Sequence, residues 1–291
     1  MINWPTNLVL DIARRRSVVF VGAGVSMGAK DSEDKRPPSW EEFLKIGIER
    51  CSAPKKDLKK TFREKDYLGC CQLIKYKMGH EWINFVNEYF SIPNYKPSEL
   101  HKELFRLDSG IVATSNFDKI YEKCVASLEE EFGSNLIVKK YYDDDLPRFF
   151  RGNEKQRLLM KIHGCIDSPD KMIFTREDYA NIRNNYQNFY RSFESMVMLN
   201  TFVFFGCSFS DPDVALILEQ YARSFSSAPP HYLVTGEKYS PEYRNMIENN
   251  YNIVILDYNK KDNHKELIQS VSDLRKMVEN KRDNLSALAL W

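Results

Sequence analysis

Four short stretches of the sequence combine glycine with small or titratable side chains, and each follows an apolar run typical of a buried strand. They are G-A-G-V-S at 22–26, S-N-F-D at 115–118, H-G at 163–164 and G-C-S-F-S-D at 206–211. In open α/β sheets, ligands bind outside the carboxyl ends of the strands. Because four such endings occur in one chain, we expect them to converge on one polar pocket.

The first stretch has the features of a phosphate-binding turn. The run at 18–21 is typical of a strand buried on both faces, and Gly22 and Gly24 follow it at once. Glycines permit a sharp turn, and outward-facing amides there would cradle a pyrophosphate. The dinucleotide fingerprint has a third glycine where this chain has Met27, with Gly28 one residue late. The turn alone therefore leaves a plain tight turn open as an alternative.

Asn116 and His163 are the candidate catalytic residues. An asparagine side chain donates and accepts hydrogen bonds but is not a base, so Asn116 suits holding a sugar hydroxyl or a water. An imidazole suits proton transfer, so His163 would accept a proton from water or a hydroxyl. Structural alternatives exist for both, with Asn116 capping a helix that begins at Phe117 and His163 as a core histidine. Asp118 and Asp211 would likewise favour the first turns of helices.

The remaining sequence predicts the elements that position these stretches. A capping box, S-W-E-E at 39–42, predicts a helix from Trp40 to Glu49, and the polar segment 30–38 before it would form a lid or a plain surface loop. Strands alternate with helices from residue 110 onward, which predicts an α/β fold: a Rossmann-like, doubly wound, mostly parallel sheet. We expect one domain over 1–291 with a small helical insertion at about 54–107. The other expected strands lie at 111–114, 136–139, 158–162, 201–205, 232–235 and 253–256.

Composition narrows the class of protein. Lys and Arg number 42 against 41 Asp and Glu, so no overall field favours nucleic acid, and no direct nucleic-acid site is evident. The six cysteines show no C-x-x-C pair, which favours a reducing compartment and no zinc ribbon. There is no signal-peptide pattern and no apolar run of roughly 20 residues, the length that spans a bilayer. We therefore expect a cytoplasmic protein with no membrane span and no metal.

In their order and spacing, G-A-G-V-S, S-N-F-D, K-I-H-G and F-F-G-C-S-F-S-D resemble the sirtuin superfamily, and above all the sirtuin-like proteins of bacterial antiviral defence. The resemblance implies an NAD+ site in which Asn116 and Asp118 hold the nicotinamide-side ribose and a water, and His163 is the general base. The other binding residues that it implies are Gly22, Ala23, Gly24 and Ser26 for the phosphates, Gly206 and Ser208 for the adenosine half, and Asp211 for a ribose hydroxyl.

Departures from the deacylating sirtuins shape the expected function. Those enzymes carry a four-cysteine zinc module and a glutamine before the asparagine, whereas this chain lacks that spacing and has Ser115. Defence-type relatives cleave NAD+ to nicotinamide and ADP-ribose, so we expect NAD+ as substrate, no metal, and NAD+ depletion in antiphage defence. The resemblance also implies a homo-oligomer and control by a partner such as a HerA-like ATPase. Alternatives are a non-catalytic NAD+ or ADP-ribose sensor or scaffold subunit and, less favoured, a protein deacylase or a nuclease subunit.

Overall fold

The computed structural model describes residues 1–132, 135–150, 156–209, 211–225 and 227–288. Seven strands form one sheet in the order β3-β4-β2-β1-β5-β6-β7, and every neighbouring pair is parallel. This confirms the expected Rossmann-like parallel sheet. The strands are β1 (Ser17–Val21), β2 (Gly110–Thr114), β3 (Asn135–Lys140), β4 (Gln156–Lys161), β5 (Thr201–Phe205), β6 (His231–Thr235) and β7 (Ile253–Asp257).

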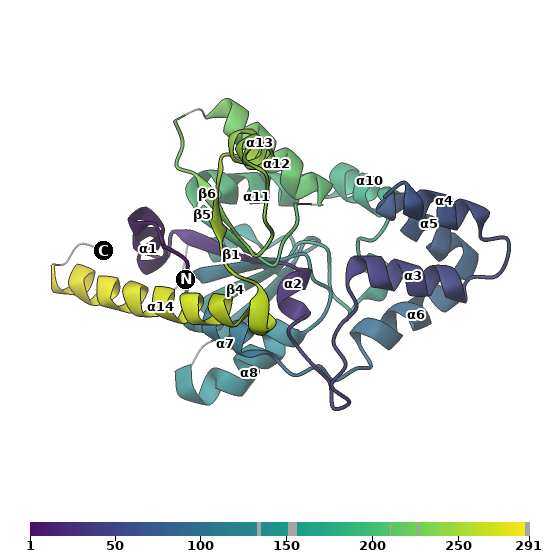
Figure 1. The fold of residues 1–291 in the computed structure, drawn as a ribbon, viewed down its shortest axis with the longest axis horizontal. Helices are drawn as coiled ribbons and strands as arrows, with labels where there is room; N and C mark the ends of the chain where they lie inside the picture. The colour runs from purple at the N-terminus through teal and green to yellow at the C-terminus, as the bar shows by residue number, and fades with distance from the viewer. Residues whose placement is uncertain (133–134, 151–155, 210, 226, 289–291) are drawn as a thin grey trace.

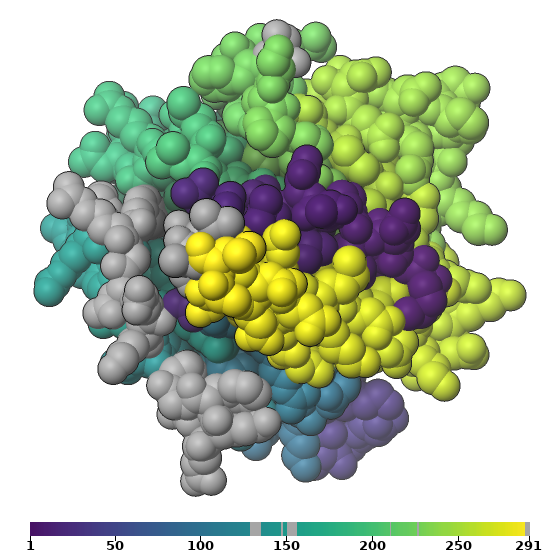
Figure 2. Space-filling view, turned by 90° about the vertical axis from the view of Figure 1, so that its left-hand side faces the viewer, coloured from purple at the N-terminus to yellow at the C-terminus, as the bar shows by residue number. Residues whose placement is uncertain are grey.

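Helices cover both faces of the sheet, as a doubly wound fold requires (Figure 1). One face carries α1 (Thr6–Ala13), α7 (Glu99–Arg106), α8 (Ile120–Phe132) and α14 (Lys261–Ala287). The other carries α10 (Arg176–Asn185), α11 (Gln187–Leu199), α12 (Pro212–Ser224) and α13 (Pro241–Tyr251). Figure 2 shows α1 and α14 side by side on the surface of the molecule. Among the described helices, none combines the length and the apolar character that a membrane crossing needs.

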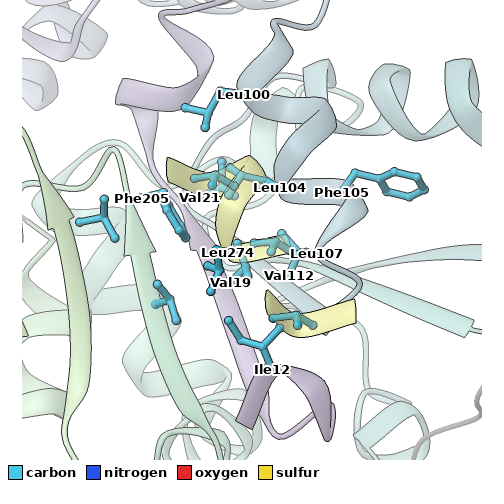
Figure 3. Packing of buried hydrophobic residues seen from close by; sticks show 14 of the residues in the cluster. Ile12, Val19, Val21, Leu100, Leu104, Phe105, Leu107, Val112, Phe205 and Leu274 are labelled. Atoms are coloured by element: carbon cyan, nitrogen blue, oxygen red, sulfur yellow. The ribbon is translucent and has the colours of Figure 1, made fainter. Parts of the chain in front are cut away.

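The central strand β1 shows why its sequence is apolar without alternation. Val19 and Val21 face the core that contains Leu274 of α14, as Figure 3 shows. Val18 and Phe20 face the opposite core, where the ring of Phe20 lies 5.2 Å from that of Phe204. Each such side chain contributes roughly 1.5–3 kcal/mol through burial. Both faces of β1 are therefore held, and the position of its carboxyl end is fixed.

Four helices form a separate cap at the end of the sheet where α2 (Ala23–Ser26) lies (Figure 1). The cap consists of α3 (Trp40–Arg50), α4 (Lys56–Arg63), α5 (Tyr67–Met78) and α6 (Glu81–Phe90). The expected capping box is present, since Ser39 accepts from the Glu42 amide and Glu42 accepts from the Ser39 amide.

The cap differs in extent from the insertion expected at 54–107. Its apolar cluster includes Phe43 and Leu44 of α3, so it begins earlier. Helix α7 belongs to the sheet instead, because Leu100 and Leu104, one turn apart, bury against the core that contains β1 (Figure 3). Two short helical segments complete the fold, α9 (Pro147–Phe150) and the 3₁₀ helix η1 (Pro169–Lys171).

Candidate active site

The register of the sheet brings the four predicted stretches to one edge. Val21 of β1 pairs with Thr114 of β2 and with Phe205 of β5, and Thr114 pairs with Lys161 of β4. The segments that follow these level strand ends enclose a cavity of about 240 Å³. Of the site residues expected from the sequence, Gly24 alone is not among those that line the cavity. The residues that line it are Gly22, Ala23, Ser26, Asn116, Asp118, His163, Gly206, Ser208 and Asp211.

The glycine turn after β1 packs against the turn after β5. The Gly22 amide donates to the carbonyl oxygen of Phe205 at 2.8 Å, and the Gly24 amide donates to that of Gly206 at 3.0 Å. Gly206 has φ +64°, and a Cβ there would lie 2.5 Å from the amide nitrogen of Val25. These two amides therefore join neighbouring turns and are not free to donate to a pyrophosphate, although the sequence had led us to expect that they would.

Asn116 is held by its amide nitrogen. Its Nδ2 donates to the Gly22 carbonyl oxygen at 3.0 Å and to Ser26 Oγ at 2.9 Å, while Thr114 Oγ1 accepts from its backbone amide at 3.0 Å. The two Nδ2 hydrogens are thus used within the protein, and the side-chain oxygen is the atom left to accept from a ligand. The capping role considered for Asn116 is not observed, because α8 begins at Ile120.

Asp118 holds Ser26, which in turn binds Asn116. Asp118 is 7% exposed; Oδ2 accepts from Ser26 Oγ at 2.8 Å, and Oδ1 accepts from the amide of Ile120 at 2.9 Å. A contiguous network therefore runs from Asp118 through Ser26 to Asn116. The sequence identified all three residues, but it did not show that they bond to one another.

His163 forms a triangle with Asp211 and Tyr179. Its Nε2 lies 2.7 Å from Asp211 Oδ2 and 3.3 Å from the Tyr179 hydroxyl, which donates to the same Asp211 oxygen at 3.0 Å. Asp211 Oδ1 caps α12 by accepting from the amides of Asp213 and Val214. Asp211 was expected to bind a ribose hydroxyl; in the structure its two oxygens cap α12 and contact His163, the candidate catalytic histidine.

The electrostatics of this triangle keep the aspartate ionised. Burial alone would raise the pKa of Asp211, but the interaction with the His163 imidazole, together with hydrogen bonds from His163, the Val214 amide and Tyr179, outweighs that effect and holds the pKa below its usual value. Burial and the neighbouring Asp211 raise the pKa of Tyr179 well above its ordinary value, so its hydroxyl stays a donor. Tyr179 was missed in the sequence; only the capping box T-R-E-D at 175–178 marks the helix that carries it.

Aromatic rings from the cap and from the loops after β2 and β4 line the cavity. The Phe174 ring lies 4.3 Å from Phe117 and is stacked 5.9 Å from Trp40. The segment expected as lid or loop contributes Pro37 and Pro38 to the same lining. Among the described residues, no lysine or arginine lines the cavity. Planar apolar surface and two carboxylates thus dominate its lining, which suits a flat cationic ring.

The acidic run at 143–145 was considered as a possible metal site. Asp143 accepts from the Lys140 amide at 2.9 Å, and Asp145 pairs with Lys139 at 2.7 Å. Within the described ranges, no three His, Cys, Asp or Glu side chains gather as metal ligands would. Ser210, inside the fourth motif, lies outside the described residues.

The sequence matches the model of the SIR2-like domain over residues 110–256, and the chain belongs to this family. This confirms the resemblance drawn from the motifs. The match includes Asn116, His163 and Asp211 but begins after the glycine turn.

Several relatives of the chain carry the same name, NAD(+) hydrolase ThsA. They include the NAD(+) hydrolase ThsA of Acinetobacter baumannii (strain 532279), 26% identical over 190 residues that cover 63% of this chain and 38% of that protein. The ThsA of Enterococcus faecium is 26% identical over 229 residues, 77% of this chain and 44% of that protein. The ThsA of Cytobacillus dafuensis is 26% identical over 206 residues, 70% and 37% respectively. The aligned part spans about two fifths of each relative's length.

Proposed function

We propose that this protein hydrolyses NAD+ to nicotinamide and ADP-ribose. The observation that carries the proposal is the placement of Asn116 and the His163–Asp211 pair on one cavity, although they follow different strands. The relatives are named NAD(+) hydrolases, which supports the same activity. The bond to be broken is already activated, because the leaving group is a positively charged pyridinium.

In this proposal, the nicotinamide-side ribose lies between Asn116 and His163. The free side-chain oxygen of Asn116 accepts from a ribose hydroxyl or from the attacking water. The wall of Trp40, Phe117 and Phe174 takes the planar pyridinium ring. Holding water and ribose in the reacting geometry lowers the barrier without strong acid or base chemistry.

The reaction then proceeds as a displacement by water at C1′ of the ribose. The bond from C1′ to the pyridinium nitrogen breaks, and its electron pair converts the ring to neutral nicotinamide. In a neutral imidazole whose Nε2–H donates to Asp211, Nδ1 carries the lone pair, so Nδ1 accepts the proton that the water loses. The proton passes to solvent, and the products are ADP-ribose, nicotinamide and one proton.

The cellular setting forms part of the proposal. An uncontrolled NAD+ hydrolase would deplete its own cell, so we infer that the activity serves antiphage defence and is switched by homo-oligomerisation or by a partner of the HerA-like ATPase kind. The support is the family resemblance. Nicotinamide release measured across protein concentrations, together with the molecular mass in solution, tests it; a rate per chain that stays constant in a strict monomer with or without the partner would contradict it.

The activity itself is tested by incubating the purified protein with NAD+ and quantifying nicotinamide. Asn116→Ala and His163→Ala should each abolish most of the release, while the exposed Asn84→Ala and His80→Ala should retain it. Calorimetry with ADP-ribose separates binding from turnover. Binding by the assembled wild type with no nicotinamide formed would replace the hydrolase by the sensor alternative, and unaffected release in the two cavity variants would remove their proposed roles.

A further inference from the structure

Lys161, the last residue of β4, is a fully buried cation. Its exposed fraction is 0%, although lysine is among the residue types least often buried. An ammonium group taken out of water is costly unless charged and hydrogen-bonding partners surround it. His163, the candidate catalytic residue, lies two residues after this buried charge in the chain.

The partners of Lys161 come from the segment that follows β2. Its Nζ donates to the backbone carbonyl oxygen of Asp118 and, at 2.8 Å, to Glu122 Oε1. Burial by itself would lower the pKa of Lys161, but the charge of Glu122 raises it above the usual value, so the ammonium stays charged. The side chain thus ties the carboxyl end of β4 to the start of α8.

One of these two contacts leads straight to the candidate site. The residue whose carbonyl oxygen Lys161 holds is Asp118, and the Asp118 carboxylate binds Ser26, which binds Asn116. The other contact is to Glu122, which lies in the first turn of α8 and does not line the cavity. Removal of either Lys161 or Glu122 breaks the ion pair, but only removal of Lys161 also removes the hydrogen bond to the Asp118 carbonyl oxygen.

We propose that Lys161 is a positioning residue for the active site, whose ammonium fixes Asp118 and through it sets Asn116 relative to His163. The catalytic consequence rests on the proposed function; the positional claim does not. If Lys161 served only as half of a structural ion pair, Lys161→Met and Glu122→Gln would have the same effect. If it positions the site, their effects differ.

The direct test is an NMR measurement on the full chain with ¹⁵N-labelled asparagine. The two Asn116 side-chain amide protons, assigned by their loss in Asn116→Asp, report the bonds to Gly22 and Ser26. We expect Lys161→Met to shift the Asn116 signals and to speed their exchange with solvent. Glu122→Gln should leave both properties at wild-type values. Equal shifts in the two variants, or no shift in Lys161→Met, would overturn the proposal.

A double variant serves as the control for loss of stability. Lys161→Met combined with Glu122→Met replaces the buried pair by apolar side chains, a change that is often neutral for folding. It restores the fold if Lys161→Met alone is unstable, and it still lacks the contact to Asp118. Displaced Asn116 signals in the folded double variant support positioning, and wild-type signals there refute it.

Kinetics provide the second readout. Misplacement of a reacting group by about 1 Å can cost about 10²-fold in rate. We expect Lys161→Met to lose on this order in kcat for nicotinamide release, with KM close to that of wild type and Glu122→Gln near wild type in both. If the wild type releases no nicotinamide, the proposed function fails while the NMR comparison still decides the role of Lys161.

Discussion

Acid should destabilise this protein through His231, the first residue of β6. The side chain is 1% exposed; its Nδ1 accepts from the Phe202 amide at 3.1 Å, and the ring lies 4.7 Å from that of Tyr221. Burial lowers its pKa to about 4. Because the folded-state value lies below the ordinary one of 6.5, the unfolded chain binds the proton more readily.

The sign and size of the effect follow from this difference. The contribution is complete above about pH 6.5 and is lost as the pH falls toward 4. Each pH unit in that window costs about 1.4 kcal/mol of unfolding free energy, so lowering the pH from 7.5 to 5.5 should cost about 1.4 kcal/mol through His231 alone. Near pH 4 the loss reaches roughly 3 kcal/mol.

Urea unfolding of His231→Asn tests this reasoning, with tryptophan fluorescence as the signal at pH 7.5, 6.5 and 5.5. The asparagine oxygen still accepts from Phe202, but the ring packing is lost, so the variant should be less stable at pH 7.5. The gap to wild type should then shrink by about 1.4 kcal/mol at pH 5.5. His80→Asn, at a side chain 93% exposed, should keep the wild-type slope. Parallel pH dependences for wild type and His231→Asn would refute the argument.

Three further predictions concern the site and its turns. Asp211→Asn keeps the cap of α12 but removes the charge beside His163, so nicotinamide release should fall about 10²-fold or more in initial-rate assays while the melting temperature changes little; an unchanged rate would count against the pair. Gly206→Ala should lose more stability in urea than Gly79→Ala, because both have positive φ but only Gly206 is crowded by Val25; equal losses, each about 1–2 kcal/mol, would show that no clash occurs. Trp40 lines the cavity, where the proposal places the pyridinium ring, whereas Trp4 and Trp82 do not line it, so NAD+ should quench the fluorescence of wild type on mixing and not that of Trp40→Phe.

The sheet could be predicted from sequence because its central strands are buried on both faces. The runs at 18–21 and 202–205 are apolar without interruption, and each lies between two helical layers. Because ligands bind at the carboxyl ends of the strands in such sheets, the polar residues that follow the strands were expected to form the site. This reasoning placed Asn116 and His163 on the same cavity although 47 positions separate them in the chain.

The bonds within the site could not be predicted in the same way. Asp211 caps α12 through Oδ1 and contacts His163 through Oδ2. The sequence around Asp211 indicates the helix cap, but nothing in it shows that His163 lies next to the other oxygen. The amides of Gly22 and Gly24 are used because β5 lies beside β1, a neighbour relation that no local spacing encodes. The extent of the cap could not be read from the sequence for a related reason, since α7 has helical spacing like α6 and only packing separates them.

The loop after β4 contacts both the candidate site and the cap. The carbonyl oxygen of His163 accepts from the Ile173 amide at 3.0 Å, and the next residue, Phe174, is inserted among Phe43 and Trp82 of the cap. A rigid tilt of the four cap helices cannot leave Phe174 in place, and the loop would carry that displacement to the imidazole. Contact between the cap and the loop that carries His163 thus runs through the Phe174 ring, and a ligand or partner that shifted the cap helices would also shift the backbone of His163.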